Sequence, residues 1–452
     1  MNNIIQQEPI CALATPNGVG AIAVIRVSGE GTFSLVAALF SGKNPTTVPS
    51  HTIHFGTIRH PQTGQIIDEV LLSVFKSPRS FTKEDTVEIS CHGSDYIVRQ
   101  ILQLLVAQGA RLARPGEFTQ RAFLNGQFDL VQAEAVADLI AADSAASHRV
   151  ALHQLRGGFS RQLASLREEL IHFASLVELE LDFGEEDVEF ADRKNLQRLI
   201  ESLQGTIAPL LDSFGAGNAL KEGTPVAIIG APNVGKSTLL NALLNEEKAI
   251  VTPIAGTTRD VIEDVLFIEG IKYRIIDTAG IRQTDDLVES MGIERSKKAI
   301  EKAEIVLMVF DSFDTYTEIA QLVPDDKKVI WVRNKIDEGY MENTFPKNDQ
   351  FIEISAKTGI GLEDLKKAIH SFTYSVIQSS DQTLVTNLRH YEHLLKTQQA
   401  LADVLRGLEM GITGDFLAQD IRLALHHLGE LTGTIVSDDL LANIFSKFCI
   451  GK

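Results

Sequence analysis

Apolar and polar positions alternate in three different ways along the chain, and each pattern indicates a different kind of structure. Residues 1 to about 125 contain short alternating runs typical of strands, such as 21–27, and one stretch with helical spacing, 95–109. From about 126 to 220, and again after 380, apolar residues recur at the spacing of long amphipathic helices. In between, short wholly apolar runs such as 226–229 are typical of strands, and each is followed by a segment bearing glycine, aspartate or asparagine.

These patterns predict a multidomain α/β and α protein. We expect an α+β domain at 1–125, a helical domain built from 126–221 and 377–452, and an α/β domain at 222–376 inserted into it. The inserted domain is expected to follow a glycine-bearing linker, 214–223. Within the helical domain the spacing predicts a helical stretch over 130–183 that is broken only near Gly157 and Gly158.

Composition narrows the class of protein. The chain carries 60 acidic and 42 basic residues and a net charge of −18, which argues against a globally basic nucleic-acid binder and confines any RNA contact to one local face. No apolar run approaches the ~20 residues of a membrane span, and the first residues lack the features of a secretory signal. We therefore expect a cytoplasmic protein without a membrane partner. The three cysteines are too widely spaced to suggest a disulfide framework or a cysteine-rich metal site.

The strongest chemical signal follows the apolar run 226–229. Gly230 is followed by four residues and then by Gly235, Lys236 and Ser237, which is the spacing of a phosphate-binding P-loop. Such a loop turns its backbone N–H groups toward phosphate oxygens, while the lysine reaches the β- and γ-phosphates and the serine binds magnesium.

Three downstream segments indicate which nucleotide is bound. Asp277-Thr278-Ala279-Gly280 follows an apolar run, which places an aspartate at a strand end beside the magnesium ion and a glycine beside the γ-phosphate. The aspartate of Asn334-Lys335-Ile336-Asp337 is suited to accept two hydrogen bonds from guanine, and Ser355-Ala356-Lys357 is expected to close the base pocket. This set resembles the GTPase signature, and it favours GTP over ATP.

A second resemblance extends over essentially the whole chain. The segments 15–29, 80–93 and 114–140, the GTPase set and the ending Phe-Cys-Ile-Gly-Lys at 448–452 together resemble the MnmE (TrmE) family of tRNA-modifying GTPases. The resemblance implies that the N-terminal domain has a tetrahydrofolate-binding fold and forms a homodimer. It also implies a potassium-activated GTPase whose relatives work with tRNA.

For the folate, the family's arginine, glutamate and lysine fall on Arg26, Glu88 and Gln127. Glutamine is a departure, because it supplies no cation for the glutamate carboxylate of the folate. The resemblance also implies that Lys452 touches the folate and that Cys449 is needed for tRNA modification. Without the resemblance, a salt-bridge partner on a strand is the simpler interpretation of Arg26. For Cys449 the alternative to the role implied by the resemblance is a small buried residue at a helix end.

For the GTPase centre, Ile281 stands where Ras-like proteins carry a water-orienting glutamine, so another group must position the water. The resemblance implies that Glu289 does so, although an exposed carboxylate at a helix start is the simpler interpretation. Potassium takes the place of an arginine finger in the family. The implied magnesium ligands are Ser237 and Thr258, and the implied potassium ligands are Asn233, Thr252, Ile254 and Thr257. Catalytic roles are predicted for Glu289, Lys236 and Cys449. The predicted GTP-binding residues are Asn233, Val234, Gly235, Lys236, Ser237, Thr238, Thr252, Thr258, Asp277, Thr278, Ala279, Gly280, Asn334, Lys335, Asp337, Ser355, Ala356 and Lys357.

The resemblance implies a GTP-hydrolysing enzyme that acts in a heterotetramer with an FAD-bearing partner similar to MnmG (GidA). Together they add an aminomethyl or carboxymethylaminomethyl group at carbon 5 of the wobble uridine in certain tRNAs. Methylene- or formyl-tetrahydrofolate supplies the one-carbon unit, and the nitrogen donor, glycine or ammonium, is left open. One alternative is a ribosome-assembly GTPase of the Era or EngA type, although the acidic chain does not show the basic face of a KH-like RNA module. Another is a folate-binding scaffold whose GTPase domain only regulates assembly.

Overall fold

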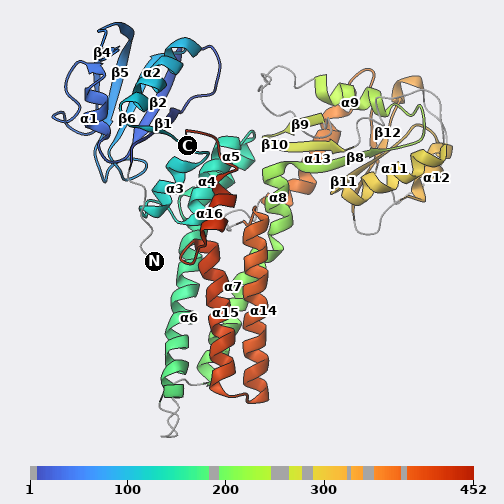
Figure 1. Ribbon diagram of the computed structural model, residues 1–452. Helices are drawn as coiled ribbons and strands as arrows, with labels where there is room; N and C mark the ends of the chain where they lie inside the picture. The colour runs from blue at the N-terminus through green and yellow to red at the C-terminus, as the bar shows by residue number, and fades with distance from the viewer. Residues whose placement is uncertain are drawn as a thin grey trace. The chain divides into compact units, whose positions relative to one another are not determined.

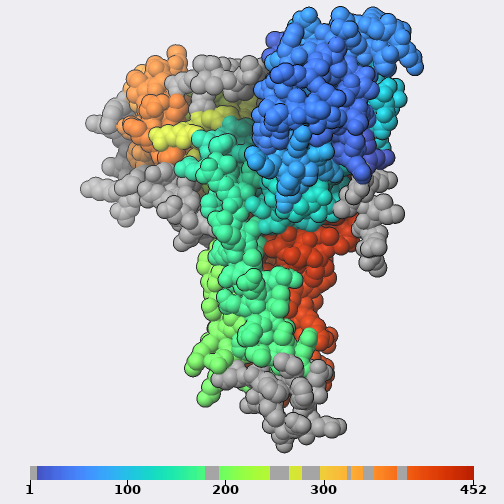
Figure 2. Space-filling view, turned by 90° about the vertical axis from the view of Figure 1, so that its left-hand side faces the viewer, coloured from blue at the N-terminus to red at the C-terminus, as the bar shows by residue number. Residues whose placement is uncertain are grey.

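The computed structural model describes residues 8–182, 193–245, 264–276, 289–322, 327–339, 351–377 and 384–451. Its contacts divide the chain into two compact units. The first comprises Met1–Ile140, Gln154–Gln197 and Gln399–Lys452, and the second comprises Ala141–His153 and Arg198–Gln398. Each unit therefore combines segments that are far apart in the sequence (Figures 1 and 2).

A seven-stranded sheet, called here the first sheet, organises the start of the first unit. Its strand order is β3-β4-β5-β6-β2-β1-β7, and all neighbours are antiparallel except β1 and β7. The strands are β1 (Ile10–Leu13), β2 (Ile22–Ser28), β3 (Phe40–Ser41), β4 (Thr52–Arg59), β5 (Ile66–Phe75), β6 (Thr86–His92) and β7 (Arg111–Leu112). They include the strand positions expected at 21–27.

The two faces of the first sheet are covered differently. Helices α1 (Thr32–Ala37) and α2 (Asp95–Ala107) cover one face, because α2 buries Ile101, Leu104 and Leu105 at helical spacing against the apolar side of the strands. On the other face, α3 (Glu117–Leu124) covers the β1 end, where Phe118 packs on Ile10.

Seven helices contain the stretches that the sequence predicted as helical. They are α4 (Leu130–Ala141), α5 (Ala145–Leu155), α6 (Gly158–Asp182), α7 (Arg193–Asp212), α14 (Leu388–Met410), α15 (Gly414–Thr432) and α16 (Asp438–Phe445). In the first unit, α6 and α15 lie side by side and are joined by an ion pair of 2.8 Å between Arg422 and Glu178 (Figure 1). The stretch 130–183 is also interrupted at residues 142–144, where the expectation of a single break is wrong. There the Ser144 hydroxyl accepts the backbone N–H of Ser147 and caps a new helix, α5.

The second unit is built on a six-stranded sheet, called here the second sheet, with the order β13-β12-β11-β8-β10-β9. Its strands are parallel except β9, which pairs antiparallel with β10. They are β8 (Thr224–Ile229), β9 (Asp264–Ile268), β10 (Ile271–Ile276), β11 (Ile305–Phe310), β12 (Lys328–Arg333) and β13 (Phe351–Glu353).

Helices cover both faces of the second sheet. One apolar cluster contains Leu239 of α9 (Lys236–Asn245) and Leu365 of α13 (Leu362–Ile377), and the other contains Ile300 of α11 (Glu289–Lys302) and Ile319 of α12 (Phe313–Ala320). A short 3-10 helix, η1 (Ile336–Glu338), follows β12. This is a doubly wound α/β arrangement, in which ligands bind outside the carboxyl ends of the parallel strands.

The residues that precede β8 differ from the expectation. The sequence predicted a linker at 214–223, but the structure has helix α8 (Phe214–Glu222) there. Ala219 and Leu220 are buried, and Leu220 joins the apolar core of the second sheet. This burial outweighs the poor helix propensity of the glycines in the segment.

Candidate functional site

The P-loop lies at the carboxyl end of β8, as the sequence predicted for a strand, a glycine-bearing loop and a helix start. β8 ends at Ile229, and α9 begins at Lys236. Gly235 has a φ of +96°, and a Cβ atom built there would lie 2.3 Å from Nδ2 of Asn334, so only glycine fits. The P-loop therefore packs directly against the segment predicted to bind the base.

Lys236 is held inside the loop. Its Nζ donates hydrogen bonds of 2.7 Å to the carbonyl oxygens of Gly230 and Ala231. Burial lowers the pKa of Lys236, while the carboxylate of Glu318 opposes that fall. A phosphate is a stronger acceptor for an ammonium than these carbonyls, so the side chain is positioned to exchange them for a nucleotide phosphate.

Asn334 connects the P-loop to the base-binding loop. Its buried amide donates to the carbonyl of Val234 at 2.8 Å and accepts the backbone N–H of Ala356 at 3.0 Å. The oxygen and nitrogen of this amide can thus be assigned from the network. Through these two bonds, a single side chain sets the distance between the phosphate and base ends of the site.

Asp337 is oriented for a base. The Ser355 hydroxyl donates to its Oδ1 at 2.6 Å, and this bond holds the pKa of Asp337 below its usual value. The carboxylate is exposed and ionised. The N–H groups of guanine can therefore replace solvent as hydrogen-bond donors to its second oxygen. Ser355, Ala356 and Lys357 follow β13, so the structure brings these predicted residues to the same edge of the second sheet.

Lys335 reveals a partner that sequence reasoning missed. Its Nζ lies 2.7 Å from Oδ2 of Asp311, the residue directly after β11, and its backbone is left-handed with a φ of +63°. The position of Asp311 at the end of an apolar strand was the available signal. The pair fixes the lysine beside the predicted base pocket.

Several predicted residues of the GTPase centre lie outside the described part of the chain. These are Thr252, Ile254, Thr257, Thr258 and the segment Asp277-Thr278-Ala279-Gly280. The backbone of Glu289 begins α11, and its side chain also lies outside the described residues. Asn233, Ser237 and Thr238 lie in the P-loop and the first turn of α9, with Asn233 exposed in a left-handed conformation of φ +62°.

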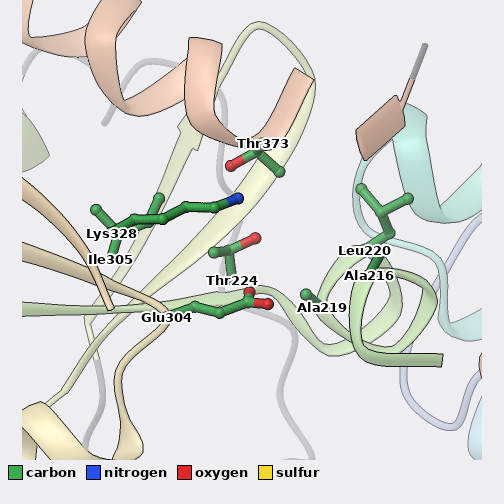
Figure 3. Close-up of a pocket in the computed structure, with 8 residues that line it drawn as sticks. All are labelled: Ala216, Ala219, Leu220, Thr224, Glu304, Ile305, Lys328 and Thr373. Carbon is green, nitrogen blue, oxygen red and sulfur yellow. The ribbon is translucent and has the colours of Figure 1, made fainter. Parts of the chain in front are cut away.

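A small hollow lies at the opposite, amino-terminal edge of the same strands (Figure 3). It is lined by Thr224, Glu304 and Lys328, which stand at or next to the starts of β8, β11 and β12, together with Thr373 of α13 and three apolar residues of α8. It encloses about 30 Å³, which is room for one or two water molecules. The hollow is too small for a nucleotide and lies at the edge of the sheet opposite the P-loop, so it is not the nucleotide site.

The predicted folate residues lie on the first sheet. Arg26 and Glu88 are cross-strand partners, and Nε and Nη2 of Arg26 both donate to Oε1 of Glu88, at 3.0 and 2.8 Å. The guanidinium also lies over the rings of Phe81 and Phe118, 5.3 and 5.6 Å from their centres. The salt-bridge interpretation of Arg26 therefore describes a real contact. The pair leaves Oε2 of Glu88 for a ligand.

The end of the chain lies on the same domain. The backbone N–H of Gly116 donates to the carbonyl of Cys449 at 3.3 Å, and Gly451 packs against Leu13, which pairs with Ile25 beside Arg26. Cys449 is exposed, so the interpretation as a buried residue is wrong, because α16 already ends at Phe445. Gln127 is exposed, and Lys452 lies beyond the described residues.

These features define a class and then a family. The doubly wound sheet, its P-loop and its guanine-type base loop are those of a P-loop GTPase. A family model described as "GTP-binding protein TrmE N-terminus" matches residues 9–127, and one described as "MnmE helical domain" matches residues 130–449. The chain belongs to the MnmE (TrmE) family.

Full-length relatives support the same assignment. Proteins named tRNA modification GTPase MnmE are 56% identical in Cytophaga hutchinsonii, over 98% of both chains, and 50% identical in Flavobacterium psychrophilum, over 99% of this chain and 100% of the relative. The FeoB G-domain from Methanococcus jannaschii matches 33% of this chain and 98% of its own, at 25% identity and a TM-score of 0.25, so the assignment rests on the family models and relatives. None of the helices in the described ranges is long and apolar enough to cross a bilayer.

Proposed function

We propose that this protein hydrolyses GTP as part of tRNA modification. The observation that carries the GTPase half is the bridge made by Asn334 between Val234 of the P-loop and Ala356 of the base loop, with Asp337 held by Ser355 beside it. The tRNA half rests on family membership and on the names of the full-length relatives.

In the GTPase centre, Lys236 binds the β- and γ-phosphates, and Ser237 and Thr258 hold magnesium. Asn233, with oxygens of Thr252, Ile254 and Thr257, would hold potassium, and the bound ion would supply positive charge for the charge that develops between the phosphates. Glu289 orients the attacking water. We expect hydrolysis to be faster in potassium than in sodium and Asn233→Ala to remove the difference; equal rates for the unaltered protein in both salts would exclude the potassium mechanism.

In the modification half, Arg26 and Glu88 bind a tetrahydrofolate, which supplies the one-carbon unit. The chemistry of the residues fits this group, since Glu88 keeps one carboxylate oxygen for the N–H groups of a pterin, and the partly buried ring of Phe81 lies beside the pair. Cys449 is exposed, and the end of the chain that carries it packs next to this sheet. The cysteine is needed for the modification reaction. The wobble uridine is modified at carbon 5 together with an FAD protein similar to MnmG.

The protein is proposed to act as a homodimer through the first sheet. Ile53, Phe55 and Leu71 are 65%, 66% and 47% exposed, and Phe55 pairs with Leu71 across β4 and β5. Because all three point to the face that α1 and α2 do not cover, they form an apolar patch of the kind that marks an interface.

The modification proposal is tested by mass spectrometry of tRNA nucleosides. A strain without this protein is expected to lack the aminomethyl-type wobble uridines, and a strain with Cys449→Ser is expected to lack them while the purified variant still turns over GTP. Unchanged nucleosides in the deletion strain, together with altered ribosome profiles, would replace the proposal with the ribosome-assembly alternative. Retained modification in the Cys449→Ser strain would remove only the cysteine from the reaction.

A further inference from the structure

Lys83 adopts a backbone conformation that side chains rarely take. Its φ is +57°, in the left-handed region that favours glycine. The residue is half-buried, and its Nζ donates a hydrogen bond of 2.7 Å to the carbonyl oxygen of Gly126. An exposed carbonyl is satisfied equally well by water, so this bond alone does not explain a lysine in a strained position.

The segment around Lys83 is fastened to the residues just before and after Gln127. The side chain of Asn125 donates to the carbonyl of Thr82 at 2.7 Å, and the rings of Phe81 and Phe128 lie 5.8 Å apart. Together with the bond from Lys83 to Gly126, these contacts align the two segments side by side. The ammonium of Lys83 therefore lies within one peptide unit of Gln127.

The same segment reaches the predicted folate pair. The ring of Phe81, two residues before Lys83, lies under the guanidinium of Arg26 at 5.3 Å, and Arg26 is bonded to Glu88. Contacts thus link Glu88, Arg26 and Phe81, and Lys83 follows Phe81 by two residues, so this part of the fold supplies a carboxylate, an aromatic ring and an ammonium. Such a set matches a ligand with a hydrogen-bonding ring at one end and an anionic group at the other.

The charge on Lys83 has no acidic partner within the described residues. Its two acidic neighbours in the sequence are engaged elsewhere, because Glu84 pairs with Arg121 and Asp85 accepts the backbone N–H of Ser77. One of the three ammonium N–H groups is used on Gly126, and the others are available to a carboxylate.

We propose that Lys83 supplies the cation that binds the glutamate carboxylate of the folate, in place of the residue at position 127. The proposal rests on the proposed folate site. It explains how that site can have a glutamine at position 127, where the family resemblance implies a lysine. The family resemblance implies a lysine where this chain has Gln127, and the structure brings a lysine from a different loop to that place. In this chain the cation comes from position 83 and not from position 127.

The test measures folate binding to the full-length protein by calorimetry, with 5-formyltetrahydrofolate as the probe. Lys83→Gly suits the left-handed backbone, so the fold is kept, and we expect its dissociation constant to rise about tenfold, as for the loss of one charge-assisted hydrogen bond. Lys83→Gly combined with Gln127→Lys should restore the affinity. The single-variant effect should shrink as salt is raised, because it is electrostatic.

Two controls make the result specific. Lys76→Ala removes an ammonium that also bonds to a backbone carbonyl, that of Thr46, and should leave the affinity unchanged. A tetrahydropterin without the aminobenzoyl-glutamate tail should bind Lys83→Gly and the unaltered protein equally. Equal affinity of Lys83→Gly and the unaltered protein for 5-formyltetrahydrofolate would overturn the role of Lys83 alone. No binding of the folate to the unaltered protein would overturn the proposed folate site, and the role of Lys83 with it.

Discussion

At the scale of single residues, the N-terminal domain contains an ionised carboxylate that is almost wholly buried. Glu117 of α3 accepts hydrogen bonds from both terminal nitrogens of Arg111, at 3.0 and 2.5 Å, and from the backbone N–H of Arg114 at 2.8 Å, and it lies 3.3 Å from Arg121. Burial by itself raises the pKa of Glu117, but these bonds and the two arginine charges lower it to about 2. The network anchors α3, which covers Arg26 through Phe118.

This network makes stability depend on pH. Because the folded pKa of Glu117 lies below its unfolded value of 4.5, the ionised carboxylate stabilises the fold above about pH 4.5, and the stabilisation is lost as the pH falls toward 2. We expect Glu117→Gln to lower the free energy of unfolding by about 3 kcal/mol at pH 7. In urea unfolding at pH 7 and pH 3, the difference from the unaltered protein should be smaller at pH 3. The exposed Glu69 of β5 provides the matched control, since Glu69→Gln should change little at either pH. A difference that does not shrink in acid would contradict the assignment.

At the scale of elements, the segment that follows α16 brings the end of the chain to the first sheet. In the tail after α16, the ring of Phe448 lies 5.2 Å from that of Phe445, the last residue of the helix, and Phe445 also lies near Phe123 of α3. Gly451 has a φ of +93°, and a Cβ atom there would lie 2.2 Å from the carbonyl oxygen of Leu13. Glycine is therefore required for the tail to reach β1.

Gly451→Ala should displace the tail without disturbing the second sheet. We expect loss of the modified wobble uridines, measured by nucleoside mass spectrometry in cells, with GTP hydrolysis within about twofold of the unaltered rate, since a clash with backbone cannot be relieved by rotating a side chain. Gly64→Ala is the matched control, because Gly64 also has a positive φ, +70°, but open space around it. If Gly451→Ala modified tRNA normally, the docked tail would have no part in the reaction.

At the scale of the whole molecule, the exposed apolar surface of the first sheet lies mostly on β4 and β5. Ile53, Phe55 and Leu71 lie on one face of these strands, opposite the face that packs on α1 and α2. Two copies that meet through this face bury apolar surface in both, which favours association.

Phe55→Asp should convert the proposed dimer to a monomer, because a carboxylate buried against a partner's apolar face loses its hydration without gaining a counter-charge. Light scattering after gel filtration at micromolar concentration measures the change. Met410→Asp is the control, since Met410 is 76% exposed at the end of α14 and should leave the mass unchanged. A monomeric unaltered protein, or a dimeric Phe55→Asp variant, would exclude the first sheet as the dimer interface.

What the sequence determined by itself was local. The P-loop spacing, the Asn334–Asp337 segment and the alternation of the strands depend on a few consecutive residues and on the periods of helix and strand, so they could be predicted without a structure. Local propensity was insufficient at 214–223, where burial of Ala219 and Leu220 made a helix from a predicted linker. It was also insufficient at Ser144, whose capping bond started a helix inside a predicted one.

Only the tertiary structure decided which distant residues meet. Three pairs that meet lie 24, 333 and 43 positions apart in the sequence: Asp311 with Lys335, Cys449 with Gly116, and Lys83 with Gly126. No local pattern encodes such pairs, because they arise from strand order, helix packing and the close approach of loops. For that reason the sequence identified the nucleotide chemistry, whereas the structure placed the ammonium beside Gln127.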